Sequence, residues 1–163
     1  MRCFPQDACK LFDATLLCKG NMPEKKPTLV WFRKDLRLAD NVALAAAVEV
    51  GGPIIPIFVW SEKEYGDWSP GAASRWWLHQ ALKSLSEQWN VKGGQLILRE
   101  GDSIEVLRAL IRETGAIRVL WNRRYEPPLR ELDIGIKRAL REDGVEVESF
   151  NSSLLNEPHT AST

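Results

Sequence analysis

The chain has 163 residues, of which 44% are hydrophobic and 27% are charged, enough to bury the core of one domain of ordinary size. Lysine plus arginine equals aspartate plus glutamate at 22 each, which excludes a global attraction to nucleic acid and leaves any DNA contact local. No apolar run approaches the roughly 20 residues that cross a bilayer, so we expect no membrane partner.

Residues 1–26 contain all three cysteines of the chain, Cys3, Cys9 and Cys18. An odd number of cysteines with no partner downstream argues against a disulfide framework and fits a reducing, intracellular compartment. No apolar core of a secretory signal stands in this stretch, which Asp7 and Asp13 interrupt. We therefore predict a poorly ordered N-terminal extension, or a start codon assigned too early, and give the cysteines no role.

The regular part of the chain opens with a strand, a helix and a second strand. In chain order they are Thr28–Phe32, the alanine-rich Asn41–Val50, and the apolar Ile54–Trp60. Asp40 is the predicted N-cap of the helix. Because proline cannot donate a hydrogen bond to a sheet, Pro56 predicts that pairing of the second strand starts late, near Ile57.

Ser61–Trp68 predicts a loop that leads into a long helix. Ser69-Pro70 would supply the N-cap and a first-turn proline of this helix. One face of it is apolar at helical spacing, with Leu78, Leu82, Leu85 and Trp89. Gly93-Gly94 would end the unit, and Gln95–Arg99 is the predicted third strand.

Two further helices frame the fourth strand, Ile117–Trp121. The first follows the capping residue Asp102, ends at Gly115, and has the apolar face Ile104, Leu107, Leu110 and Ile111. The second follows the arginine-rich loop Asn122–Pro128, ends at Asp143-Gly144, and has the apolar face Leu129, Leu132, Ile136 and Leu140. Val145–Phe150 alternates valine and glutamate, which predicts a half-exposed edge strand, whereas the earlier strands look buried on both faces.

Strands that alternate with helices across short connections predict an α/β fold. We expect a doubly wound, Rossmann-like, five-stranded parallel sheet in the order 3-2-1-4-5, with helices on both faces. The domain would span residues 27–150, and residues 151–163 would be a linker or a cut end.

A ligand crevice is expected where the winding direction reverses, between the first and fourth strands. The loops at that point are Arg33-Lys34-Asp35 and Asn122–Glu126, which suit a planar, polar, anionic small molecule. No glycine-rich G-x-G-x-x-G follows the first strand and no Walker sequence occurs, so a dinucleotide or triphosphate held by such a loop is not expected.

Four segments in this order resemble the DNA photolyase and cryptochrome family, above all plant-type cryptochromes and the bacterial photolyases related to them. They are Leu29–Asn41 with its Arg-x-Asp-Leu-Arg turn, Ser69–Leu78, Trp121–Pro127 and Phe150–Pro158. The resemblance implies light-driven chemistry by a flavin adenine dinucleotide in a C-terminal helical domain that is missing here. It also implies an antenna pigment, methenyltetrahydrofolate or a deazaflavin, in the N-terminal domain.

Carried over position by position, the resemblance implies pigment contacts from Lys34, Phe58, Val59, Trp60, Asn122, Arg124 and Glu126. Folate binders of the family often have Asn-Glu where Pro128-Leu129 stands, and deazaflavin binders often have an acidic residue in place of Arg124. The identity of the pigment therefore stays open, as does a site without one.

Three functions remain open at this point. The chain would be the antenna-binding domain of a photolyase that repairs cyclobutane pyrimidine dimers, inactive alone and meeting DNA only through the helical FAD domain. It would alternatively be the same domain of a cryptochrome photoreceptor, or a stand-alone small-molecule-binding module. We expect no catalytic residue and no metal site in the chain itself.

Several polar and aromatic residues have a structural interpretation instead. The tryptophans, including Trp76 and Trp77 on the long helix, are expected to pack in the core, except Trp60, whose strand end would stack on a pigment. Arg33, Asp35 and Arg37 would form a salt-bridged corner. The arginine pair 123–124 would be solvated or paired with Glu126.

Overall fold

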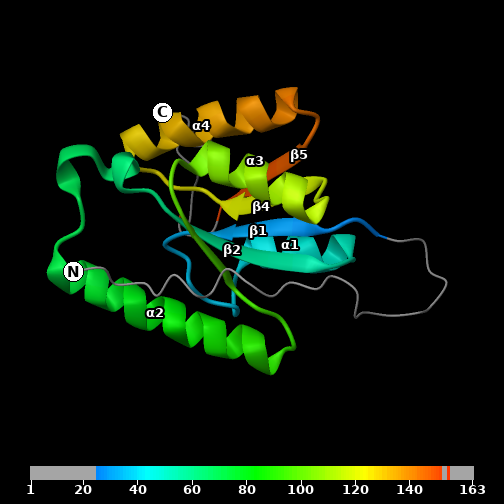
Figure 1. The fold of residues 1–163 in the computed structure, drawn as a ribbon, viewed down its shortest axis with the longest axis horizontal. Coiled ribbons are helices and arrows are strands. Elements are labelled where there is room, and N and C mark those ends of the chain that lie inside the picture. The colour runs from blue at the N-terminus through cyan, green and yellow to red at the C-terminus, as the bar shows by residue number, and fades with distance from the viewer. Residues whose placement is uncertain (1–24, 152–153, 155–163) are drawn as a thin grey trace.

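The computed structural model describes residues 25–151 and residue 154. Its centre is a parallel sheet in the order β3-β2-β1-β4-β5, which confirms the predicted fold class and strand order (Figure 1). The strands are β1 Thr28–Phe32, β2 Ile54–Trp60, β3 Ile97–Glu100, β4 Arg118–Asn122 and β5 Glu146–Phe150. The predicted N-terminal extension up to residue 24, its cysteines, and most of the predicted linker lie outside the described residues.

Helices cover both faces of the sheet. They are α1 Val42–Val50, α2 Ala72–Val91, α3 Ser103–Thr114 and α4 Pro127–Glu142, with a 3-10 segment, η2, at Glu62–Trp68. α3 and α4 lie on one side of the sheet and α2 on the other in Figure 1. Within residues 25–151 and 154, no helix is long and apolar enough to cross a membrane.

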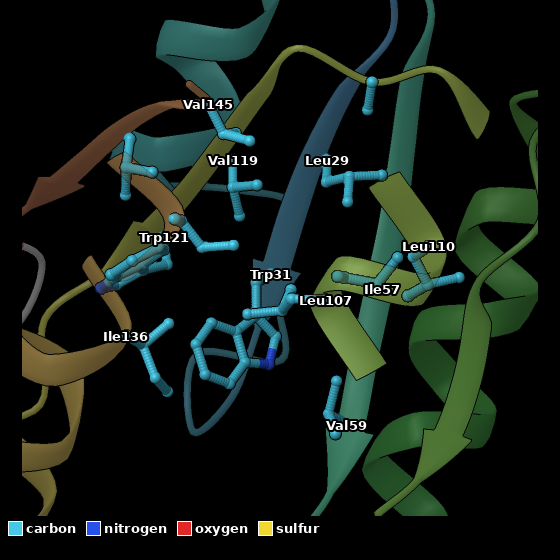
Figure 2. Packing of buried hydrophobic residues seen from close by; sticks show 13 residues of the cluster. Leu29, Trp31, Ile57, Val59, Leu107, Leu110, Val119, Trp121, Ile136 and Val145 are labelled. Atoms are coloured by element: carbon cyan, nitrogen blue, oxygen red, sulfur yellow. The ribbon is translucent and has the colours of Figure 1, made fainter. Parts of the chain in front are cut away.

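The sheet separates two apolar clusters, because successive side chains of a strand point to opposite faces. One face carries Trp31 and Trp121, which pack with Leu107 of α3 and Ile136 of α4 (Figure 2). The other cluster joins β1 to α1 and α2, with Val30, Phe32, Ala43, Ala47, Leu82, Leu85 and Trp89. Both apolar faces predicted for α2 and α3 are therefore used in the core.

The paired strands β1 and β4 are aligned so that two buried tryptophans meet near their carboxyl ends. Trp31 is the register partner of Trp121, and their rings form an edge-to-face pair with centroids 5.5 Å apart. Both indoles are 1% exposed. This pair closes the core directly beneath the carboxyl ends of β1 and β4.

The prediction for Pro56 is wrong on one side of β2 and right on the other. Pairing with β1 already begins at Ile54, opposite Thr28. Pairing with β3 begins only at Ile57, opposite Ile97. Pro56 thus has one strand as a neighbour, where its missing N–H group costs no ladder hydrogen bond.

The starts of α1 and α2 differ from the predictions. Asn41, not Asp40, caps α1, because its side chain accepts from the Leu44 N–H, while Asp40 adopts a left-handed φ of 50°. Gly71 caps α2 in place of Ser69. The Ser69 hydroxyl lies 3.2 Å from the Arg75 guanidinium and so caps nothing. The segment predicted as a loop before it contains η2, kinked at Gly66.

Two predictions about burial are also wrong. β3 is an edge strand with alternating exposure, and Leu98 is 40% exposed, so the earlier strands are not all buried on both faces. Trp76 and Trp77 are 57% and 68% exposed rather than packed in the core. They lie in the first turns of α2, ahead of Leu82, the first residue of that helix that is fully buried against the sheet.

Candidate functional site

The loops after β1 and β4 line one pocket of about 580 Å³, called here the loop pocket. Its lining comprises both predicted loops together with one further arginine and one leucine: Arg33, Lys34, Asp35, Arg37, Asn122, Arg123, Arg124, Tyr125, Glu126 and Leu154. The fold brings these loops together because β1 and β4 are paired neighbours whose chains then leave in opposite directions. Five side chains of this lining are cationic and two are acidic.

Asn122 fixes the floor between the loops and is 3% exposed. Its amide donates to the Asp35 carboxylate and, over 2.9 Å, to the Asn41 side chain. Its oxygen accepts from the Ala43 N–H at 3.1 Å. With every donor and acceptor of its amide engaged, Asn122 joins the end of β4 to the start of α1 and positions the pocket around it.

Below the loops lies a buried chain of four charges. The Asp133 carboxylate of α4 accepts from Arg33 at 2.6 Å and from Arg124 at 2.7 Å. Arg124 also pairs with Glu64 of η2 at 2.8 Å. All four side chains are at most 11% exposed, and two positive charges balance two negative charges. Such a chain is favourable only while it is complete, because each member would otherwise be an unpaired buried charge.

The pKa values of the two arginines shift in opposite directions. Burial lowers the pKa of the Arg33 guanidinium, and the Asp133 carboxylate opposes that shift. Burial also lowers the pKa of Arg124, but the carboxylates of Asp133 and Glu64 outweigh it, so its pKa lies above the usual value. The prediction that Arg124 is solvated or paired with Glu126 is wrong.

The predicted corner of Arg33, Asp35 and Arg37 exists, but its partners differ from those expected. The Asp35 carboxylate accepts from the Arg33 backbone N–H at 2.9 Å, while the Arg33 guanidinium turns to Asp133. Arg37 pairs with Asp40 at 3.6 Å. The corner is therefore held by hydrogen bonds of the loop, by the Arg37–Asp40 pair and by the contact of Arg33 with α4.

Lys34 and Glu126 close the open side of the loop pocket. Their side chains form an ion pair and are 63% and 46% exposed. The hydrogen bond from Lys34 holds the pKa of the Glu126 carboxyl below its usual value. An exposed pair of this kind is weak and can exchange one partner for a ligand.

A second pocket, of about 300 Å³, lies beside the first at the carboxyl ends of β1 and β2 and is called here the aromatic pocket. Trp31, Phe58, Tyr65 and Trp77 contribute rings to its lining. Arg33, Lys34 and Arg124 line both pockets, so the two pockets adjoin each other.

The residues predicted to contact a pigment are distributed over these two pockets. Asn122 and Glu126 line the loop pocket, Phe58 and Val59 the aromatic pocket, and Lys34 and Arg124 line both. Trp60 lines neither of them; its ring lies against that of Tyr65, with centroids 5.5 Å apart.

The sequence reasoning missed four residues of the site: Glu64, Tyr65, Trp77 and Asp133. Glu64 and Tyr65 lie in η2, which was predicted to be a loop without a role. Asp133 could have been predicted to be a buried charge, because it is acidic and lies in the interior of α4 next to the apolar Leu132. No sequence pattern distinguishes Trp77 from Trp76.

Three buried hydrogen-bond donors around the aromatic pocket have no acceptor among the described residues. They are Nε of Arg33, Nε of Arg124 and Nε1 of Trp31. All three belong to residues that line this pocket. Three buried polar atoms of residues that line neither pocket are unpaired as well, Oγ1 of Thr28 and Nε1 of Trp89 and of Trp121, so the three donors do not by themselves mark a ligand site.

Comparison with known proteins identifies relatives of the chain. The family model described as DNA photolyase matches residues 28–163. The deoxyribodipyrimidine photo-lyase of Agrobacterium fabrum is 51% identical over 137 residues, which are 84% of this chain and 28% of that protein. Cryptochrome-2 of Arabidopsis thaliana is 42% identical over 138 residues, 84% of this chain and 22% of the relative.

A solved structure has the same fold. The bacterial class III photolyase from Agrobacterium tumefaciens superposes with a TM-score of 0.81 at 46% identity. The match covers 89% of this chain and 30% of that one. This chain therefore spans less than a third of the length of these relatives.

Proposed function

The chain belongs to the DNA photolyase family and corresponds to the N-terminal α/β domain of its members, and we propose that it binds an antenna pigment. The observation that carries the proposal is the pair of adjoining pockets, the loop pocket and the aromatic pocket, which share Arg33, Lys34 and Arg124 in their linings. It combines arginine and lysine side chains with four aromatic rings, which suits a planar ring system with an anionic tail.

The residues present fit methenyltetrahydrofolate or a deazaflavin as a class. Lys34, Arg124, Glu126, Phe58 and Val59 would hold the pigment. Asn122 would position the loops around it, and Trp60 would support the site through Tyr65. The pigment, when bound, absorbs light and passes the excitation energy on. The protein orients the ring, pairs the tail with cations and keeps water from the buried charges.

We propose further that the domain, residues 27–150, serves an FAD-dependent photolyase that repairs cyclobutane pyrimidine dimers. The 51% identity to a deoxyribodipyrimidine photo-lyase supports this function. The receiving flavin would be held by a helical domain joined after residue 150, and DNA would be bound through that domain. A role in DNA repair implies an intracellular location.

A photoreceptor role is the second candidate, supported by 42% identity to a plant cryptochrome. The two functions share this domain, because a photo-lyase and a cryptochrome both match the same part of this chain. They differ in whether light absorbed by the complete protein splits a dimer or only alters a signalling state, which a repair assay on the complete protein would separate.

Reconstitution with pigment tests the proposed function. The purified chain would be mixed with methenyltetrahydrofolate and, separately, with a deazaflavin, and free pigment would be removed by gel filtration. We expect the absorption band of one of them to elute with the protein at one equivalent. Elution of the protein without either pigment would contradict the proposal.

A further inference from the structure

The sheet has two open edges, because β3 and β5 each pair with one neighbouring strand in the part of the chain that the structure describes. An open edge presents backbone N–H and carbonyl groups with which a strand of another molecule can pair. Edge strands are therefore a surface through which copies of a chain can join. On β3 this tendency is increased by Leu98, an apolar residue that is 40% exposed.

On β5, the backbone groups that face away from the sheet belong to Val147 and Ser149. The Glu146 N–H donates at 2.9 Å to the residue before β4, and the Phe150 carbonyl accepts at 2.8 Å from the residue after β4. Residues 146 and 150 therefore face β4. Because the backbone groups of successive residues in a strand point to opposite sides, those of residues 147 and 149 point outward.

Arginine side chains occupy both outward carbonyl groups of β5. The Arg141 guanidinium, from the last turn of α4, donates to the Val147 carbonyl at 3.1 Å. The Arg123 guanidinium donates to the Ser149 carbonyl at 2.7 Å and, through Nε, to the Ser149 hydroxyl at 3.2 Å. An incoming strand would have to displace these charge-assisted bonds, which are stronger than hydrogen bonds between neutral groups.

The same edge also gathers positive charge. Lys137, one turn before Arg141 on α4, donates to the Ser149 hydroxyl at 3.2 Å. Burial, followed by the charges of Arg141 and Arg123, lowers the pKa of Lys137, and the charge of Glu148 opposes that shift. Two copies that met along β5 about a twofold axis would bring two such clusters together, so like-charge repulsion adds to the effect of the occupied carbonyl groups.

The β3 edge has a similar arrangement with one arginine. The Gly101 N–H donates to the Trp60 carbonyl at 2.9 Å, so residues 99 and 101 face β2 and the Leu98 carbonyl faces outward. Arg99 donates to that carbonyl at 3.3 Å and pairs with Glu113 of α3 at 3.6 Å. Each open edge of the sheet therefore has an arginine on an outward carbonyl group.

We infer that Arg99, Arg123 and Arg141 block the open edges of the sheet, so that a second copy of this chain does not add its own edge strand. The partner that each edge fits is the matching strand of another copy, and the arginines keep that strand from pairing. The inference concerns association of the chain and not pigment binding, because Arg99 and Arg141 line neither pocket.

Replacement of Arg141 in the full chain tests this inference by sedimentation velocity. Methionine keeps the apolar stem of the side chain and removes its charge and its donors. Wild type should sediment as a monomer. The association constant of R141M should be at least about tenfold higher, because a tenfold change corresponds to about 1.4 kcal/mol, the size of one hydrogen-bond contribution. R141K should recover most of the wild-type behaviour, because an ammonium group still donates to a carbonyl.

R138M is the matched control, because it removes the same charge from the same helix at a side chain that is 80% exposed and pairs with Glu142 at 4.0 Å. It should stay monomeric. Hydrogen exchange locates the contact: amides of residues 146–150 should gain protection in R141M as its concentration rises. R99M tests the other edge and should gain protection at residues 97–100.

Circular dichroism would show which variants keep the fold. A folded R141M that stays monomeric, equal association of R138M and R141M, or protection outside residues 146–150 would overturn the inference. A wild type that already pairs through β5 would overturn it as well. If R141M lost its fold, R99M would decide the matter, and a folded, monomeric R99M would contradict the blocking role of the arginines.

Discussion

Asp133 is the residue on which the buried part of the site most depends. Its carboxylate is shared by Arg33 and Arg124 at 2.6 and 2.7 Å. D133N would leave two buried guanidinium groups facing a neutral amide. We expect the free energy of unfolding to fall by about 3–5 kcal/mol, measured by urea denaturation, because removing one partner strands a buried charge.

The exposed pair Arg138–Glu142, with side chains 80% and 71% exposed, supplies the control for that measurement. E142Q should change the free energy of unfolding by less than about 0.5 kcal/mol, since solvated ion pairs contribute little. If D133N were as mild as E142Q, the four-charge chain would have no structural role.

Lys34 and Glu126 predict a pH dependence at the rim of the loop pocket. The Lys34 hydrogen bond lowers the pKa of Glu126 from its usual value of 4.5. The folded-state pKa therefore lies below the unfolded one, so the pair stabilises the fold above pH 4.5 and loses that contribution as pH falls through the folded value. In K34M the pKa of Glu126 should rise, which a carboxyl NMR titration would detect.

K83M serves as the reference for K34M, because Lys83 is an exposed lysine of α2 and does not line either pocket. It should leave the Glu126 titration curve where wild type has it. An unchanged pKa in K34M would mean that the ion pair does not persist in solution.

Two glycines show how backbone conformation governs the elements. Gly115 ends α3 in the left-handed region at φ 67°, whereas Gly135 lies inside α4, and an added Cβ would meet nothing within 4 Å at either position. G115A should destabilise the fold by about 1 kcal/mol or more, because only glycine adopts this conformation without strain. G135A should stabilise it by about 0.5–1 kcal/mol, because alanine restricts the unfolded chain and favours the helix.

The midpoint of thermal unfolding should shift in opposite directions in the two variants. The midpoint should fall for G115A and rise for G135A. A shift of both in the same direction would show that packing rather than backbone conformation decides the outcome.

Helices and strands that are marked by a local sequence pattern, such as an apolar run or a capping residue, could be predicted from the sequence. The apolar runs of β1 and β2, and Asp102, whose side chain accepts from the N–H groups of Ile104 and Glu105, are where the pattern placed them. The predicted starts of α1 and α2 were wrong because of contacts with residues outside each helix start. At α1 the Asn41 side chain also bonds to Asp35, and at α2 the Ser69 hydroxyl accepts from Arg75. Local propensity cannot register a competing partner from another segment.

At the scale of the whole molecule, the sequence predicted that the two loops come together, but not the contacts within the pocket that they line. Strand order alone places the loops after β1 and β4 together, and they do line one pocket. The partners of Arg124 come from Glu64, 60 residues earlier, and from Asp133 on α4, so pairing depended on packing that no pattern encodes. The aromatic pocket could not be predicted either, because it forms only when α2 and η2, which lie far from the loops in sequence, pack beside them.

The most direct test of the account is to map the bound pigment on the isotope-labelled chain by NMR. The titration would use methenyltetrahydrofolate or a deazaflavin, whichever wild type binds. We predict that amide signals shift in residues 33–37, 61–65 and 122–126. The signals of Gly51 and Gly144, which lie at the amino ends of the strands, should not shift. Shifts confined to the amino ends, or no shift in the loops at saturation, would contradict a pigment site at the carboxyl ends of β1, β2 and β4.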